Sequence, residues 1–289
     1  MGADIRFPNL GITIDSLGKS ISVGGFSIAY YGIIIAVGMI AGFYMASWQA
    51  KRLGQNSEVI LDLALWDIFF AIIGARLYYV IFSWDYYCEH PTEIFNIRGG
   101  GMAIYGGVIA GVLTTLVFAK VKKLSFGELT DAASSGLLVG QIFGRWGNFF
   151  NREVFGGYTD NLFAMQLKQS QVRSSDVNTD LLRHLVDIDG VKYIQVHPTF
   201  LYESLWNLLL LIVILLWTKK RKFGGQLFLM YLFGYGLGRF WIEGIRVDQL
   251  MLFGTGIPVS QLLSGLLAVI SGGILVFKFW KMRKAGNAA

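Results

Sequence analysis

A polar, glycine-rich stretch from residue 144 to residue 157 holds side chains whose types and spacing could do chemistry. Arg145, Asn148, Asn151 and Glu153 lie there, at the end of a long apolar run. The planar guanidinium group of arginine binds phosphate or carboxylate through paired hydrogen bonds. An arginine at the centre of a membrane helix costs about 2.5–3.5 kcal/mol, so it usually has a partner or a task. The simpler interpretation is an arginine that extends to the lipid headgroups. The two asparagines, the glutamate and four glycines around it favour a binding or catalytic site.

The composition indicates the environment of this stretch. The 289 residues are 54% hydrophobic and 15% charged, whereas a soluble domain carries about 25% charged residues. The net charge of +6 could suggest a nucleic-acid partner, but the basic residues fall in short clusters between apolar runs. That distribution is typical of membrane topology, so we expect no nucleic acid to bind. The single cysteine, Cys88, excludes an intramolecular disulfide, and the chain has no zinc or P-loop motif, so we expect no metal and no cofactor.

The apolar runs predict an all-α membrane protein with seven transmembrane helices of about 20 residues each. The predicted spans are residues 27–48, 61–82, 101–119, 129–150, 197–217, 226–244 and 259–279. We treat residues 1–289 as one integral membrane domain. Residues 158–196 form the only long polar connection, and we expect an external subdomain with a short helix near 181–185. The first 25 residues lack the pattern of a cleaved signal peptide.

The positive charges predict the orientation. Alternate connections after the first, third, fifth and seventh spans carry 2, 3, 4 and 4 Lys or Arg residues. Lys and Arg prefer the cytoplasmic side, so these connections should face the cytoplasm. The N-terminus and the 158–196 segment are then outside, and the C-terminus is cytoplasmic.

The orientation predicts that several polar side chains share one depth. Three of them lie in the first turns of spans that enter from outside: Tyr31, Tyr105 and Glu203. Three others lie in the last turns of spans that exit outward: Arg76, Arg145 and Arg239. All six should collect in the outer half of the membrane. Three cations without a matching cluster of carboxylates indicate an anionic ligand, and a phospholipid headgroup resides at this depth.

Several of these residues belong to motifs that resemble one family. The stretch Gly144-Arg-Trp-Gly-Asn-Phe-Phe-Asn-Arg-Glu-Val-Phe-Gly156 closely resembles the signature of the bacterial phosphatidylglycerol–prolipoprotein diacylglyceryl transferases. Further matching motifs are Tyr31-Gly32, Gly74-Ala-Arg76, Tyr105-Gly-Gly107, His197-Pro-Thr-Phe-Leu-Tyr-Glu203 and Gly238-Arg-Phe-Trp-Ile-Glu243. The resemblance implies seven spans in the bacterial plasma membrane, with the active site toward the outer leaflet. It also implies transfer of a diacylglyceryl group from phosphatidylglycerol to the lipobox cysteine of a prolipoprotein signal peptide, with release of glycerol-1-phosphate.

The resemblance also implies roles for individual residues. Arg145 would bind the phosphate of phosphatidylglycerol, and Arg239 would stabilise the leaving group or help to deprotonate the thiol. Glu153 and Glu243 would hold the arginines in place. Glu243 follows Arg239 by four residues, so a simple intrahelical ion pair is the alternative.

The remaining candidates would position the substrates. Tyr31, Asn148 and Asn151 would orient the headgroup and the thiol, and Gly156 and Gly157 would allow a tight turn or a close approach of the substrate. Further substrate-binding candidates are Arg76, His197, Glu203 and Arg246.

Tyr105 departs from the family pattern, because many members have histidine at this position. A histidine could act as general base toward the thiol, whereas tyrosine, with a pKa near 10, is a poor base. Either Tyr105 only donates a hydrogen bond to the substrate, or the base lies elsewhere. His197 is the nearest histidine by expected depth, although it could equally be a residue of the helix start.

Two other classes of function remain open at this stage. A transporter or flippase for an anionic phospholipid would also use arginines inside the membrane, but it typically shows repeat symmetry and a site near the midplane. A lipid-binding or chaperone protein would fit the arginines and leaves the asparagines and glutamates unexplained. We expect a monomer whose partners are phosphatidylglycerol, prolipoprotein signal peptides and membrane lipids.

Overall fold

The computed structural model describes residues 3–97, 99–252 and 255–286, and the chain forms two compact units. Unit 1 comprises residues 1–42, 135–219 and 229–289, and unit 2 comprises residues 43–134 and 220–228. Unit 1 contains most of the predicted site residues, and unit 2 contains Arg76 and Tyr105.

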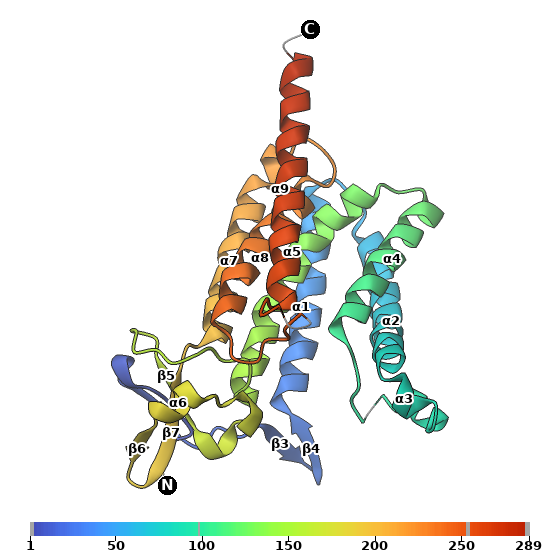
Figure 1. Ribbon diagram of the computed structural model, residues 1–289. Coiled ribbons are helices and arrows are strands. Elements are labelled where there is room, and N and C mark those ends of the chain that lie inside the picture. The colour runs from blue at the N-terminus through green and yellow to red at the C-terminus, as the bar shows by residue number, and fades with distance from the viewer. Residues whose placement is uncertain (1–2, 98, 253–254, 287–289) are drawn as a thin grey trace. The chain divides into compact units, whose positions relative to one another are not determined.

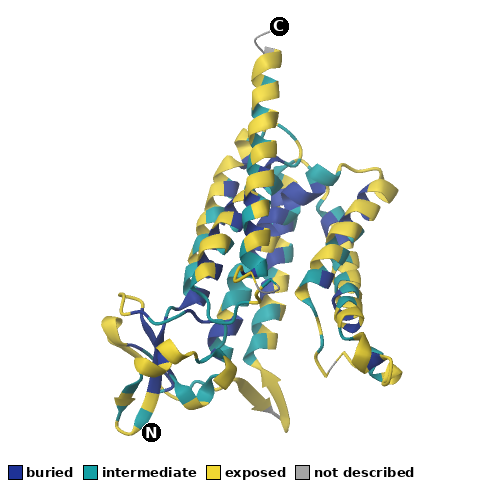
Figure 2. Cartoon of the chain, viewed as in Figure 1, coloured by how far each residue is buried: buried dark blue, intermediate teal, exposed yellow. Residues whose placement is uncertain are grey.

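Long helices dominate the described residues (Figure 1). Seven of them have 19 to 28 residues: α1 (Tyr30–Arg52), α2 (Ser57–Phe82), α4 (Ile104–Lys122), α5 (Phe126–Asn151), α7 (Thr199–Trp217), α8 (Gln226–Ile245) and α9 (Val259–Gly286). Each overlaps one predicted span. Many large apolar residues on these helices are exposed, which fits a lipid environment. Figure 2 shows the exposed residues along the helices in yellow.

Four of these helices are long and apolar enough to cross a membrane: Tyr30–Arg52, Ile104–Lys122, Thr199–Lys220 and Val259–Ala285. The other three, α2, α5 and α8, carry the three arginines that the depth argument placed in the site, Arg76, Arg145 and Arg239. The prediction of a mainly helical membrane protein is therefore confirmed, and the number of seven spans stays a prediction.

The prediction of an all-α fold misses two small sheets. Five antiparallel strands pair in the order β2-β1-β5-β7-β6. Their bounds are β1 (Ile5–Phe7), β2 (Ile12–Ile14), β5 (Met165–Lys168), β6 (Val186–Ile188) and β7 (Val191–Val196). The sheet joins the N-terminal segment to the 158–196 segment. Strands of three to six residues give only a weak period-2 pattern, and β1 pairs with a strand about 160 residues away.

The sheet covers a small apolar core in unit 1. Ile5, Leu167, Leu181 and Ile194 are fully buried there together with Phe155. The predicted short helix is present as α6 (Thr179–Arg183), where the side chain of Asn178 caps the first turn. Further short helical segments are α3 (Trp84–Tyr87), η1 (Pro8–Leu10), η2 (Pro91–Phe95), η3 (Gln169–Gln171), η4 (Ser174–Asp176) and η5 (Thr218–Lys220).

Asp4 fastens the N-terminal strand to the rest of unit 1. Its carboxylate accepts hydrogen bonds from Lys168 at 2.8 Å and Gln171 at 3.0 Å, and Arg152 lies at 3.4 Å. Burial alone would raise the pKa of Asp4, but these hydrogen bonds and the two cations outweigh it and hold the pKa below its usual value. Because Arg152 directly precedes Glu153, this network also fixes the backbone of the candidate site.

A two-stranded hairpin leads into the first long helix. Its strands are β3 (Ser20–Val23) and β4 (Phe26–Ala29), and α1 begins at the next residue.

In unit 2, α2 and α4 pack closely because small residues face one another. A Cβ atom at Gly106 would overlap the backbone of Gly74, and a Cβ atom at Gly74 would overlap Ala110. Small residues at such contacts are typical of helix packing in membranes. At the other end of the unit, Arg221 binds Glu128 at 2.7 Å and Asp131 at 3.0 Å.

Candidate active site

A chain of alternating charges runs through unit 1. Arg145 Nη2 of α5 lies 2.7 Å from Glu203 Oε2 of α7, and Glu203 Oε1 lies 2.6 Å from Arg239 Nη1 of α8. Arg239 Nη2 lies 2.5 Å from Glu243 Oε2 on the next turn of the same helix. Glu203 therefore joins two arginines that are almost one hundred residues apart. The array places three helices in a fixed relation to one another.

Arg246 continues the array just beyond α8. Its Nη1 lies 3.2 Å from Glu243, and its guanidinium group makes a two-pronged contact with Asp248 at 2.7 and 2.9 Å. Burial by itself lowers the pKa of Arg246, but the hydrogen bond and charge of Asp248 and the charges of Glu243 and Glu203 outweigh burial and raise the pKa.

The charges in this array balance. Three arginines (145, 239 and 246) alternate with three carboxylates (203, 243 and 248). The inference from the sequence that the arginines lack matching carboxylates is therefore wrong for Arg145 and Arg239. The carboxylates of Glu203 and Glu243 are only 4% and 3% exposed, and a buried carboxylate needs such partners.

Arg145 is the member of the array whose N–H donors are least used by other side chains. Its side chain is 20% exposed, and besides Glu203 it reaches only Asn148 Oδ1, at 3.5 Å, among the described residues. A guanidinium group has five N–H donors, so several of those on Arg145 can receive an external anion. Both terminal nitrogens of Arg239, in contrast, already contact carboxylates.

Two asparagine amides converge on Glu153 beside Arg145. Asn148 Nδ2 and Asn151 Nδ2 both donate to Glu153 Oε1, at 3.1 and 3.2 Å, and Arg173 Nη2 lies 3.2 Å from Oε2. Glu153 was expected to hold one of the site arginines, and it holds Arg173 instead. Arg173 belongs to the 158–196 segment, and its basic charge alone did not distinguish it from its neighbours in the sequence.

Glycines let other groups approach this part of α5. A Cβ atom at Gly147 would come within 2.7 Å of the ring of Tyr31, so the ring packs directly on the helix backbone. Trp146 Nε1 donates to Ser204 Oγ at 3.2 Å, which ties α5 to α7 next to Glu203.

The turn after α5 has an unusual backbone. Arg152 and Val154 have φ angles of 56° and 60°, a left-handed conformation that a β-branched residue rarely adopts. Thr199 Oγ1 donates to the carbonyl of Val154 and helps to hold it. Backbone strain of this kind clusters at functional sites.

Gly156 and Gly157 connect this turn to the starts and ends of other helices. Gly156 N donates to His197 O at 3.0 Å, and Gly157 N donates to Ile245 O at 2.9 Å. A Cβ atom at Gly156 would lie 2.8 Å from both His197 Cβ and Ile245 O, which explains the glycine there. A Cβ atom at Gly157 would meet open space, so packing does not explain the second glycine.

His197 lies at the start of α7. Its Nδ1 lies 3.2 Å from the Tyr202 hydroxyl, which in turn accepts a hydrogen bond from Asn161 Nδ2 at 3.0 Å. Burial lowers the pKa of His197 below its usual value and so favours the neutral imidazole.

Arg76 and Tyr105 belong to unit 2. Arg76 is buried, and it donates to the backbone carbonyls of Glu93, Ile94, Gly100 and Gly101 at 2.5 to 2.9 Å. It therefore holds the connection between α2 and α4 in place. Tyr105 is half-buried in the first turn of α4. Their expected place beside Arg145 and Arg239 stays a prediction.

The fold and the site together define the class of protein. Several helices are long and apolar enough to cross a membrane, and three helices place arginines, carboxylates and amides in one buried array. Such a protein is a multi-pass membrane protein with a site suited to an anionic group.

Comparison with known proteins identifies the family. The family model for prolipoprotein diacylglyceryl transferase matches residues 19–277, so the chain belongs to this family. A relative from Listeria monocytogenes is 42% identical over 263 residues, which cover 91% of this chain and 90% of the relative. A relative from Bacillus cytotoxicus is 41% identical over 269 residues, 93% of each chain. Both relatives are named phosphatidylglycerol–prolipoprotein diacylglyceryl transferase.

Proposed function

We propose that this protein transfers the diacylglyceryl group of phosphatidylglycerol to the cysteine thiol of a prolipoprotein. The names of the relatives and the family match support the reaction. One observation supports assigning this reaction to particular residues. The carboxylate of Glu203 contacts both Arg145 and Arg239 and so orients the two guanidinium groups relative to one another. Two fixed guanidinium groups suit a phosphate diester better than a single flexible cation does.

The reaction forms one bond and breaks one. The thiolate sulfur attacks the glycerol CH₂ carbon that carries the phosphate, a C–S bond forms, and the C–O bond to the phosphate breaks. The products are a thioether and glycerol-1-phosphate, and the thiol proton leaves to a base, to solvent or to the released phosphate. Negative charge grows on the leaving phosphate, so preorganised cations in a water-poor site stabilise the transition state.

Arg145 and Arg239 take different parts in this scheme. Arg145 binds the phosphate of the lipid, because its guanidinium group has donors that are not used by Glu203 and Asn148. Arg239 makes ion pairs with both Glu203 and Glu243, so its guanidinium group is held in place and does not move with the substrate. A cation held in place is suited to stabilise the negative charge that develops on the leaving group. Arg246 holds Glu243 from the far side.

Asn148, Asn151 and Glu153 orient the headgroup or the approaching peptide. The amides are held by one carboxylate oxygen of Glu153, which restricts their rotation. Tyr31 packs on the same helix at Gly147 and adds a phenol that can donate to the substrate.

Thiol activation does not need a strong base in this scheme. A free thiol has a pKa near 8.5, and nearby cations lower it. Tyr105 then positions substrate through its hydroxyl group, and the neutral imidazole of His197 is the alternative proton acceptor. Arg76, a further substrate-binding candidate, holds the connection before α4.

We place all seven long helices across the bacterial plasma membrane, with the N-terminus outside and the C-terminus in the cytoplasm. The distribution of Lys and Arg between the spans supports this orientation. The 158–196 segment and the active site then face the outer leaflet, where a prolipoprotein emerges. One integral membrane domain, working as a monomer, suffices for this reaction.

A mass measurement tests the reaction. The purified chain is incubated with phosphatidylglycerol and a lipobox peptide, and the peptide should gain the mass of one diacylglyceryl group on its cysteine. Phosphatidylcholine as donor and a peptide with serine in place of the cysteine are the controls, and neither should give the product. A peptide of unchanged mass with phosphatidylglycerol would exclude the transferase activity.

A further inference from the structure

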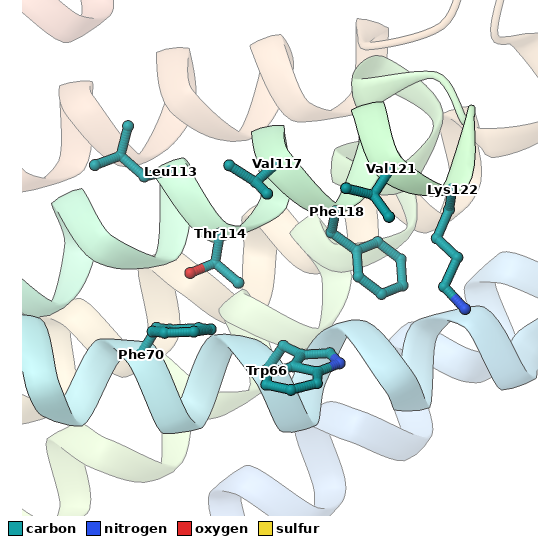
Figure 3. Close-up of a pocket in the computed structure, with 8 residues that line it drawn as sticks. All are labelled: Trp66, Phe70, Leu113, Thr114, Val117, Phe118, Val121 and Lys122. Carbon is teal, nitrogen blue, oxygen red and sulfur yellow. The ribbon is translucent and has the colours of Figure 1, made fainter.

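A second feature of the molecule, outside the ionic array, is an apolar groove in unit 2. It has a volume of about 420 Å³ and lies between α2 and α4 (Figure 3). The rings of Trp66 and Phe70 come from α2, and Val117 and Phe118 are among the side chains from α4. Lys122 lies at one end, with its ammonium group on the side of α2.

The groove has the shape and polarity of a binding site for an amphiphile. Seven of the eight residues that line it have no charge, and the single charged residue, Lys122, comes from the last turn of α4. Basic pockets between membrane helices bind the headgroups of anionic lipids. An apolar trough that ends at a cation is complementary to an acyl chain that ends in a phosphate.

Lys122 and Tyr105 lie at opposite ends of α4. They are 17 residues apart, which is about 25 Å along a helix. A lipid whose headgroup reaches Lys122 therefore belongs to the leaflet opposite to the level of Tyr105. With the proposed orientation this is the cytoplasmic leaflet, whereas the donor lipid of the proposed reaction is in the outer leaflet.

The lining favours a lipid chain over another helix. Helices dock in membranes through small residues that let the backbones approach. The contact between α2 and α4 follows this rule at Gly74, Gly106 and Ala110. The groove follows it less, because Thr114 is the one small residue among the eight described residues that line it. Large rings and branched side chains leave a channel that suits a flexible acyl chain.

One carboxylate competes for the lysine. Asp62 Oδ2 lies 3.8 Å from Lys122 Nζ, and both side chains are more than half exposed. An exposed pair at this distance is weak, so a phosphate can displace it. The other two lysines near this end of α4, Lys120 and Lys123, are exposed and do not line the groove.

We propose that this groove binds one acyl chain of an anionic phospholipid from the leaflet on the side of Lys122, and that the lipid phosphate pairs with Lys122. The site selects the charge of the headgroup rather than its chemical identity. It is an accessory lipid site that the transfer reaction does not require.

A local crosslinker tests this site. Benzoylphenylalanine replaces Val117, whose side chain is exposed in the groove, and the full chain is reconstituted in vesicles. The vesicles contain about one-fifth dioleoylphosphatidylserine in dioleoylphosphatidylcholine, and neither lipid is the donor of the proposed reaction. After illumination, mass spectrometry of the peptide around residue 117 gives the ratio of the two lipid adducts. We expect the ratio of phosphatidylserine adduct to phosphatidylcholine adduct to be about fivefold above the bulk ratio of the two lipids, the factor for one lysine at an anionic surface.

Matched variants identify the cause of the enrichment. Lys122→Gln should reduce it to the bulk ratio, Lys120→Gln should leave it unchanged, and Asp62→Asn should increase it. The same crosslinker at Leu116, which is exposed on α4 but does not line the groove, should report the bulk ratio. A bulk ratio at residue 117 in the unchanged chain, or an adduct with a second protein chain in place of lipid, would overturn the proposal. Because the readout does not involve phosphatidylglycerol or transfer, its failure would leave the transferase proposal unaffected.

Discussion

Replacing Glu203 with Gln removes the charge that Arg145 and Arg239 share. In the wild type each carboxylate oxygen contacts one guanidinium group, at 2.7 and 2.6 Å. Glutamine keeps one acceptor and turns an NH₂ group toward the other arginine. A hydrogen bond to a charged group contributes about 1.5–3 kcal/mol, and one of the two is lost together with the negative charge.

We therefore expect kcat/KM for transfer to fall by about 30- to 150-fold, which corresponds to about 2–3 kcal/mol. The exposure of Arg145 keeps the expected loss below the upper range for a fully buried pair. The assay is the initial rate of thioether formation on a lipobox peptide, together with the thermal unfolding midpoint in the same detergent.

The matched control is Glu128→Gln. Glu128 makes a contact of the same length with Arg221 in unit 2, and its side chain is 35% exposed. Its removal should change kcat/KM by less than about threefold. If the Glu203 variant folds and stays within about threefold of the wild type, Glu203 does not organise the arginines for catalysis. An equal loss in both variants would point to a general effect on folding.

Three further predictions concern topology, thiol activation and the N-terminal strand. In intact cells, a membrane-impermeant thiol reagent should label a cysteine introduced in residues 158–196 but not one introduced at Lys220, and labelling at Lys220 would reverse the orientation. Tyr105→Phe should lower the transfer rate by about 5- to 150-fold and leave the shape of the pH–rate profile unchanged. Tyr105→His should move the pH optimum of the transfer rate downward. A loss of transfer at every pH in the Phe variant, with lipid binding intact, would contradict a positioning role. Asp4→Asn should destabilise the protein by about 1–2 kcal/mol at neutral pH. The pKa of Asp4 is lowered in the folded state, so its contribution is present above pH 3.8 and is lost as the pH falls below that value; unfolding midpoints that differ equally at neutral and strongly acidic pH would refute this.

Local patterns in the sequence predicted the helices and one ion pair of the array, between Arg239 and Glu243. Apolar runs of about 20 residues indicate membrane helices wherever they occur, and Glu243 lies one turn from Arg239 by helix geometry alone. The depth argument also put Glu203 among the site residues.

Contacts between distant segments could not be predicted in the same way. That Glu203 bridges Arg145 and Arg239 depends on how three helices pack, and no spacing within one segment indicates it. The partner of Glu153, Arg173, lies in a segment whose fold comes from pairing with an N-terminal strand about 160 residues away. Asp248, only two residues after Arg246, was the one missed partner that a local charge pattern could have suggested.

The central claim is that Arg145 and Arg239 act together on one phosphate. A double-mutant cycle on kcat/KM for diacylglyceryl transfer tests it, with Arg145→Lys, Arg239→Lys and the combined variant, because lysine keeps the charge and loses the paired hydrogen bonds. We predict that each single variant loses about 30-fold or more and that the combined variant loses at least about tenfold less than the product of the two losses. Two losses that simply multiply, or either single variant with near-normal activity, would contradict the account.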